Sequence, residues 1–333
     1  MKHFRPRLSR RAFWVLCALL VCLRLALTGF QQAYIWVGGA PLDDELMFRA
    51  ANHITAGQWL GAYDYLTLSK AMFFPVWLAL LHALHLPYLI SGAALWCGAA
   101  LLATFAFSTL WRKKDPTQGR VLTLGLFAVL AFLPSSWAAY TLRVYRDNIF
   151  PALCLYFFAG MAGMALRAVF TPEKPLWPWL AAAGAGLACG YLDREDAGLF
   201  LLPFAAAATV IVAVVLAGKR RWKALAAQVI PYVMLGVGVL TFCTLNYTHY
   251  GVFALSDFSE GSFAAAMGAM MRVDTDSTAP YLSVPADARK KIYDAVPELE
   301  PLAYWLEEDA QLQNDFRDPN LDDYRAGSSY WAI

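Results

Sequence analysis

The chain has 333 residues, of which 59% are hydrophobic and only 16% charged, with a formal net charge of +2. Soluble domains contain about 45–50% apolar residues. The composition therefore excludes a disordered chain and a basic nucleic-acid-binding surface, and it argues against an ordinary soluble enzyme. Several apolar runs approach or exceed the roughly 20 residues that cross a bilayer. We expect an all-α polytopic membrane protein with no nucleic-acid partner.

The first apolar run, 12–30, follows five basic residues of the N-terminus. A signal peptide has a similar charged region and apolar core, but no A-x-A-like cleavage site closes this run. We therefore predict a first transmembrane helix with a cytoplasmic N-terminus. Six further spans bring the expected count to seven: 88–111, 121–139, 149–166, 176–192, 198–217 and 225–245.

The segment 71–86 is the doubtful one, because it has only 16 residues and contains Pro75. If it stays on one side of the membrane, the cytoplasmic segments hold 15 Lys and Arg against 5 in the outer loops; if it crosses, the numbers become 8 and 12. The positive-inside rule favours the first topology, with 71–86 as a juxtamembrane helix at the outer interface. The extracytoplasmic segments are then 31–87, 140–148, 192–197 and 246–333.

Two domains follow from this topology: a transmembrane domain over 1–245 and a water-facing region over 246–333. The second holds 15 acidic residues against 6 Lys and Arg. Its pattern predicts short amphipathic helices that begin at prolines. The sequence stops at GSSYWAI without a polar tail, so we expect this extracytoplasmic helical region to be incomplete.

An acidic pair opens a predicted helix in the first outer loop. Asp43 and Asp44 stand at its start, Gly57 ends it, and its apolar residues suit a membrane surface. One interpretation is an aspartate that caps free helix amides. The other is a carboxylate placed just outside the bilayer to act as a general base or to bind a metal.

Basic residues are scarce in the same outer loops, yet two of them, Arg143 and Arg146, lie close together beside Asp147. Interfacial anchoring by snorkelling side chains is one interpretation. The other adds Lys70 and Arg194 and predicts a phosphate-binding set, because Arg binds phosphate through its bidentate fork and Lys as a point charge.

Other polar or small residues in the apolar runs have structural interpretations. Arg24 lies inside the first span, where it either snorkels outward or pairs with an acid. His82 and His85 have the spacing of one helix face, but interfacial packing explains them better than a metal site. Gly186 and Gly190 form a G-x-x-x-G pair that predicts close helix packing.

The order of these motifs resembles the GT-C glycosyltransferases, in particular protein O-mannosyltransferases and aminoarabinose transferases. The resemblance covers roughly residues 12–250. It rests on the acidic pair, then AANHITAGQWLGAY with Gly57 and Trp59, then TLSKAMFFPVWLALLHAL with Lys70 and Pro75. YRDN at 145–148 and LDRED at 192–196 resemble later outer loops of that fold. The family's Lys-Pro-Pro form is absent, since four residues separate Lys70 from Pro75.

This resemblance implies a module of seven transmembrane helices, a polyprenyl-phosphate sugar donor and an acceptor in the cell envelope. Asp43 or Asp44 would be the general base of an inverting transfer, and the four basic residues would bind the donor phosphate. Asp147, with Asp43 or Asp44, would complete a divalent Mg or Mn site, as in the oligosaccharyltransferase branch. An outward site without a glycine-rich phosphate loop also favours a lipid donor over a nucleotide sugar. One alternative is a transporter or lipid flippase. The other is a scaffold with an acidic outer domain.

Overall fold

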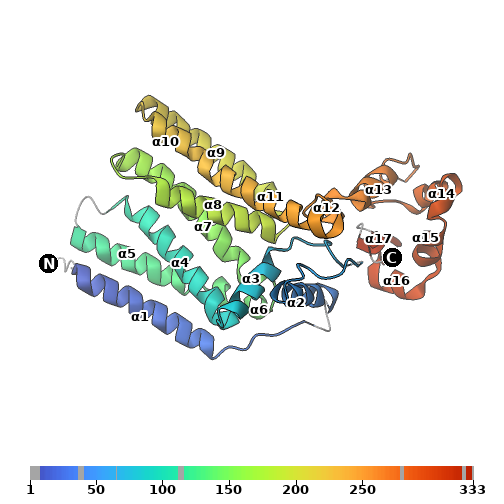
Figure 1. Ribbon diagram of the computed structural model, residues 1–333, viewed down its shortest axis with the longest axis horizontal. Helices are drawn as coiled ribbons and strands as arrows, with labels where there is room; N and C mark the ends of the chain where they lie inside the picture. The colour runs from blue at the N-terminus through green and yellow to red at the C-terminus, as the bar shows by residue number, and fades with distance from the viewer. Residues whose placement is uncertain are drawn as a thin grey trace. The chain divides into compact units, whose positions relative to one another are not determined.

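A computed structural model describes residues 8–36, 41–64, 66–111, 116–277, 281–324 and 328–331. The chain forms two compact units, Met1–Leu255 and Ser256–Ile333, and the described residues are almost entirely helical (Figure 1). The helices of the first unit are α1 (Arg10–Gly29), α2 (Pro41–Thr55), α3 (Phe73–Ala83), α4 (Tyr88–Ser108), α5 (Pro116–Ala131), α6 (Ala139–Leu142), α7 (Phe150–Phe170), α8 (Trp177–Asp193), α9 (Ala197–Gly218), α10 (Trp222–Ala226) and α11 (Ile230–Tyr250).

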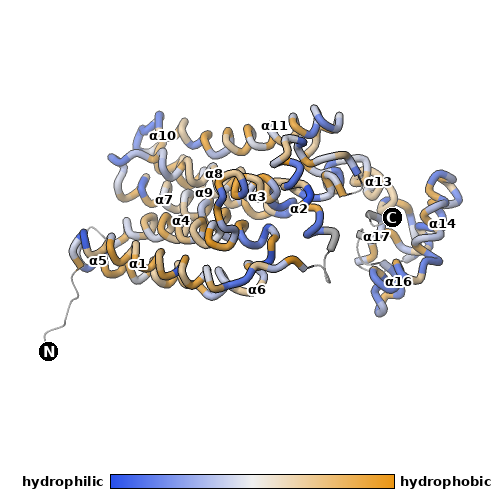
Figure 2. The backbone as a smooth tube through the Cα atoms, turned by 60° about the horizontal axis from the view of Figure 1, so that its bottom comes forward, coloured by the Kyte–Doolittle hydropathy of each residue, from blue (hydrophilic) through white to orange (hydrophobic). Residues whose placement is uncertain are grey.

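Long apolar helices make up most of the first unit, and Figure 2 shows hydrophobic residues along most of their length. Among the described residues, five helical stretches are long and apolar enough to cross a membrane, or six if α5 and the bent Pro134–Leu142 form one span. These helices confirm an all-α polytopic membrane protein. The five stretches are Arg10–Gly29, Tyr88–Ser108, Phe150–Phe170, Ala197–Gly218 and Trp222–Tyr250.

The predicted span 176–192 corresponds to α8, which has only 17 residues and is not among these stretches. At 1.5 Å per residue it is about 25 Å long, near the lower limit for a crossing. It packs between α7 and α11 and runs beside them (Figure 1). The count of seven crossings stays a prediction.

Helix α3 occupies the doubtful segment and has only 11 residues. A helix of that length measures about 16 Å, roughly half of the hydrocarbon core, so it does not cross on its own. It packs against α2 instead. The expectation that the apolar face of α2 lies on a membrane surface is wrong, because Leu46, Met47 and Ala50 are buried in a cluster with Phe74 and Tyr145.

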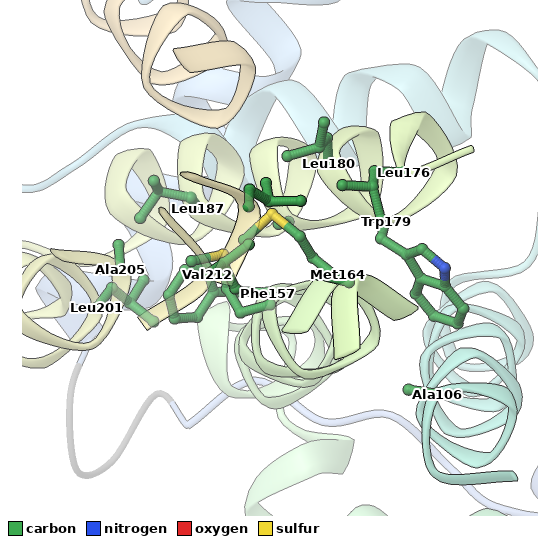
Figure 3. Packing of buried hydrophobic residues seen from close by; sticks show 14 of the residues in the cluster. Ala106, Phe157, Met164, Leu176, Trp179, Leu180, Leu187, Leu201, Ala205 and Val212 are labelled. Atoms are coloured by element: carbon green, nitrogen blue, oxygen red, sulfur yellow. The ribbon is translucent and has the colours of Figure 1, made fainter. Parts of the chain in front are cut away.

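Small residues allow the central helices to approach closely. A Cβ on Gly186 would meet the backbone nitrogen of Phe157 and would lie 2.6 Å from the carbonyl oxygen of Leu153, both in α7. Gly190, one turn later, has only side-chain neighbours at 3.2 Å or more. The predicted packing role of this pair is therefore confirmed at Gly186. Figure 3 shows an apolar cluster of residues from α4, α7, α8 and α9, which includes Phe157.

The second unit, Ser256–Ile333, consists of short helices as predicted, several of which begin at prolines. Arg289 is buried in it and pairs with Glu307 and Asp323 at 2.6 Å each. Its described elements are α12 (Asp257–Glu260), α13 (Ser262–Met270), α14 (Ala286–Ala295), a 3₁₀-helical turn (Pro297–Leu299), α15 (Pro301–Ala303), a π-helical turn (Tyr304–Glu308), α16 (Ala310–Phe316), the antiparallel pair β1 (Arg317–Asp318) and β2 (Asp323–Tyr324), and α17 (Ser328–Trp331).

Candidate functional site

The acidic pair lies at the end of the first unit that carries α2, α3 and α6. Asp44 is 1% exposed and forms an ion pair with Arg143, whose Nε donates to its Oδ1 at 2.9 Å. Its other oxygen accepts from the backbone N–H of Trp36 at 2.6 Å. Burial alone would lower the pKa of Arg143, but the bond to Asp44 outweighs it and the pKa is raised. Asp44 therefore serves as the fixed partner of a buried guanidinium.

The segment after α1 joins the same contact. The N–H of Tyr34 donates to the carbonyl of Leu142 at 3.1 Å, and the carbonyl of Tyr34 accepts from Val144 at 2.9 Å. These bonds hold the end of α1 against the loop that carries the predicted cations. Residues 43–44 and the 140s therefore lie on one side of the bundle, as the topology without a crossing at 71–86 predicts.

Asp43 has a different environment from its neighbour. Its side chain is 33% exposed, one oxygen lies 3.4 Å from Nζ of Lys70, and the other accepts from the hydroxyl of Tyr145 at 3.1 Å. Burial raises the pKa of Tyr145 to about 12, so this hydroxyl stays a hydrogen-bond donor at neutral pH. Asp43 is thus an oriented carboxylate that solvent and a ligand can reach.

Arg146 connects this pair to the loop between α8 and α9. Its guanidinium donates to Glu195 at 2.9 Å, to the backbone carbonyl of Asp193 at 3.1 Å and to the hydroxyl of Tyr145 at 2.9 Å. Burial opposes ionisation of Glu195, but Arg146 and the backbone N–H of Ala71 outweigh it and lower the pKa of Glu195. Arg146 is thus neutralised by an internal carboxylate.

Arg194 completes the cluster at its more open edge. Its guanidinium contacts Asp147 and Asp196 at 3.1 Å each and lies 5.2 Å from the ring centre of Phe150. Its side chain is 31% exposed, similar to the 34% of Lys70. These two cations are therefore the accessible ones, whereas Arg143 and Arg146 are buried in internal ion pairs.

All the site residues predicted from the sequence lie in this cluster, but their pairing required the structure. Neither aspartate is the N-cap of α2, because that helix begins at Pro41. Tyr145 and Glu195 were not predicted, although both stand in the quoted motifs YRDN and LDRED. A tyrosine or glutamate in an aromatic, interfacial loop has no distinctive spacing, so no sequence signal separates it from its neighbours.

A divalent-metal site formed by Asp147 with Asp43 or Asp44 stays a prediction. Asp147 accepts from Arg194, and both oxygens of Asp44 already have donors. In the part of the chain that the structure describes, no three His, Cys, Asp or Glu side chains come together in a metal-binding arrangement.

Arg24 lies near the C-terminal end of α1 (Arg10–Gly29), outside this cluster. It is 2% exposed, its Nη2 donates to the carbonyl of Ser136 at 2.7 Å, and its guanidinium carbon lies 4.0 Å from the ring centre of Trp137. Both expectations for Arg24 were wrong: it neither points outward nor pairs with a described acid. The carbonyl of Ser136 satisfies Nη2 and the ring of Trp137 faces the charge, whereas Nε and Nη1 are buried without a hydrogen-bond partner among the described residues.

An apolar cavity of about 290 Å³ adjoins the charged cluster. It lies between α3, α7 and α8, and its lining includes Trp77, Leu153, Gly186 and Cys189. Cys189 stands one helical turn before Asp193, whose carbonyl binds Arg146. The cavity and the cations are therefore about one helical turn apart along α8.

No protein-family model, curated protein or solved structure matches this chain.

Proposed function

We propose that this chain is an integral glycosyltransferase of the cell membrane. It takes a sugar from a polyprenyl-phosphate donor and transfers it, with inversion, to an acceptor of the cell envelope on the extracytoplasmic side. The observation that carries the proposal is the reachable carboxylate of Asp43, held 3.4 Å from Lys70 within a cluster of cations at one end of a membrane bundle. The resemblance to the GT-C enzymes supports the same reaction.

Asp43 is the general base in this proposal, and Asp44 is a positioning residue. A base must reach the hydroxyl that it deprotonates. Asp43 is partly exposed, and the hydroxyl of Tyr145 fixes its orientation. Asp44 is fully buried and satisfies Arg143, so its oxygens have no approach for a substrate.

Lys70 and Arg194 bind the donor phosphate, because theirs are the partly exposed side chains among the four predicted cations. Arg146 and Glu195 act indirectly by holding Tyr145 and the segment around Ala71 in place. A cation that is already paired in the interior has little remaining attraction for a ligand, whereas one whose side chain is one-third exposed can exchange its partner.

The step itself balances with these groups. The proton of the acceptor hydroxyl passes to a carboxylate oxygen of Asp43, and the acceptor oxygen bonds to the anomeric carbon. The bond from that carbon to the phosphate oxygen breaks, and its electron pair leaves with the polyprenyl phosphate. Lys70 and Arg194 stabilise the charge that develops on this leaving group.

A lipid donor also accounts for the neighbouring cavity. At about 290 Å³ it is near the lower end of the roughly 300–1,000 Å³ typical of small-ligand sites, and its accessible lining is apolar. The first isoprene units of a donor would fill it while the phosphate reaches the cations. A nucleotide sugar has no apolar chain for such a cavity.

The test compares Asp43→Asn with Glu45→Gln in the full chain reconstituted into liposomes. Glu45 lies on the same helix and is 55% exposed, so its variant removes the same charge outside the cluster. The substrates are undecaprenyl-phosphoryl sugars, and the measurement is release of undecaprenyl phosphate in the presence of envelope acceptors. We expect Asp43→Asn to lose about 10²–10⁴ in rate, the range typical of general bases.

Glu45→Gln should stay within about twofold of the unchanged protein, because no transition-state group is removed. Undecaprenyl phosphate should still raise the unfolding temperature of Asp43→Asn, since its binding cations remain. Turnover by Asp43→Asn at the rate of the Glu45→Gln control would reject the general base. Absence of any stabilisation by undecaprenyl phosphate would reject the lipid donor.

A further inference from the structure

A second cavity, of about 420 Å³, lies at the other end of the first unit. Its lining comprises Arg10, Phe13 and Trp14 of α1, Phe105 of α4, and Arg120 and Thr123 of α5. Arg10 opens α1 and Arg120 is in the second turn of α5, while the far ends of both helices lead to the Asp43 cluster. Figure 1 shows the starts of these two helices side by side, away from α2 and α3.

The charges of this cavity are uncompensated in the part of the chain that the structure describes. Arg10 is exposed and forms no described hydrogen bond or ion pair. Arg120 donates its Nε to the carbonyl of Leu8 at 2.7 Å, which orients the guanidinium without neutralising it. In the cluster around Asp43, by contrast, Arg143 and Arg146 each have a carboxylate partner.

Three aromatic rings form the apolar wall of the cavity. The ring centres of Phe13 and Trp14 are 5.3 Å apart, and those of Trp14 and Phe105 are 5.6 Å apart. Trp14 nevertheless stays 47% exposed. The cavity thus combines two cations at its rim with an aromatic surface that is open to its surroundings.

The position along α1 sets this cavity at the membrane surface. The 20 residues of α1 measure about 30 Å, which equals the thickness of the hydrocarbon core. Its first residue, Arg10, therefore lies at the depth of lipid phosphates, and Trp14 at the interface that tryptophan favours. Val15, Leu19 and Leu23 are at least half exposed on the same helix and offer an apolar surface below it.

We propose that this cavity binds the phosphodiester headgroup of an anionic phospholipid. Basic cavities between transmembrane helices are the form that such sites take, and each cation near an anionic leaflet strengthens the attraction about fivefold. Guanidinium groups suit phosphate oxygens because they bind them through two parallel hydrogen bonds. The acyl chains lie along the exposed side of α1. This inference is independent of the proposed glycosyl transfer.

The test uses Trp14 as the reporter. Dibromo-phosphatidylglycerol or dibromo-phosphatidylcholine is titrated into the full chain in mixed micelles, and the Trp14 signal is obtained by subtracting the Trp14→Phe variant. We expect half-maximal quenching at a mole fraction about thirtyfold lower for the glycerol lipid, as two cations would give. Equal quenching by the two lipids would overturn the proposal.

Arg10→Gln/Arg120→Gln should remove this preference. The matched control is Arg220→Gln/Lys223→Gln, which removes two exposed charges beyond α9, and it should retain the preference. Because Arg120 also bonds to Leu8, the single variant Arg10→Gln provides a second measurement and should reduce the preference by about fivefold. Loss of the preference in the control as well would assign it to overall charge and overturn the site.

Inorganic phosphate separates the lipid from a free anion. If the lipid headgroup is the ligand, phosphate should reduce quenching no more than sodium chloride of equal ionic strength, since both only screen the attraction. Phosphate that displaces the brominated lipid beyond this salt effect would show a site for free phosphate and would contradict the lipid assignment.

Discussion

Asp43 and Asp44 are neighbours in the chain, yet their surroundings divide two tasks between them. Asp44 is buried against Arg143 and fixes the loop that carries the cations, whereas Asp43 faces Lys70 and stays reachable. Consecutive helix residues point about 100° apart, so one side chain can enter the core while its neighbour stays partly exposed. Asp44 is therefore needed for the structure of the site, and Asp43 for the proposed reaction.

Asp44→Asn should lower the free energy of unfolding by about 3 kcal/mol, because removal of one partner leaves the buried charge of Arg143 uncompensated. Asp43→Asn should cost less than about 1 kcal/mol, since its ion pair with Lys70 is one-third exposed. Thermal unfolding of the purified full chain in detergent measures both. Equal losses for the two variants would contradict the division of roles.

The sequence predicted every charged residue that we place at the reacting centre, but not which of them is free to act. Lys70, Arg143, Arg146 and Arg194 were interchangeable as phosphate ligands when only sidedness and charge were known. The structure distinguishes them through Glu195, because a carboxylate 49 residues away neutralises Arg146. Such a pairing depends on how α7, α8 and the loop before α3 pack, which no local pattern encodes.

Among the elements, the helices of the bundle were predictable because length and apolar composition determine a crossing. The amphipathic face of α2 was assigned to the wrong environment, since Leu46 and Met47 are buried against protein. Periodicity identifies an apolar face but does not say whether lipid or protein covers it. The short α3 supplies that cover, and its own packing depends on residues far along the chain.

The contact of α7 and α8 gives a prediction at the scale of elements. Gly186→Ala should destabilise the bundle by about 1–3 kcal/mol, because the added methyl group would meet the α7 backbone, which cannot move aside as a side chain can. Gly190→Ala is the matched control on the same helix, with only side-chain neighbours at 3.2 Å or more, and should cost less. A Gly190→Ala variant less stable than Gly186→Ala would refute this packing.

For the whole molecule, the positive-inside rule and the structure agree on one point, that residues 43–44 and 143–147 share a side. The positive-inside count that favoured this topology places the same side outside the cytoplasm. The second unit then follows α11 on that outer side, while the loop after α9 lies in the cytoplasm. This orientation remains a prediction, and labelling from outside the cell tests it.

Cysteines introduced one at a time at Glu45, Glu298 and Lys223 should react differently with a membrane-impermeant maleimide in intact cells. The first two are exposed on the proposed outer side and should be labelled at once, whereas Lys223→Cys should be labelled only after the membrane is opened. The native cysteines lie in apolar runs, where a charged reagent does not enter, so the unsubstituted chain gives the background. If Lys223→Cys were the only one of the three variants labelled in intact cells, the topology would be the inverse of the predicted one. The Asp43 cluster would then face the cytoplasm, and an extracytoplasmic acceptor could not reach it.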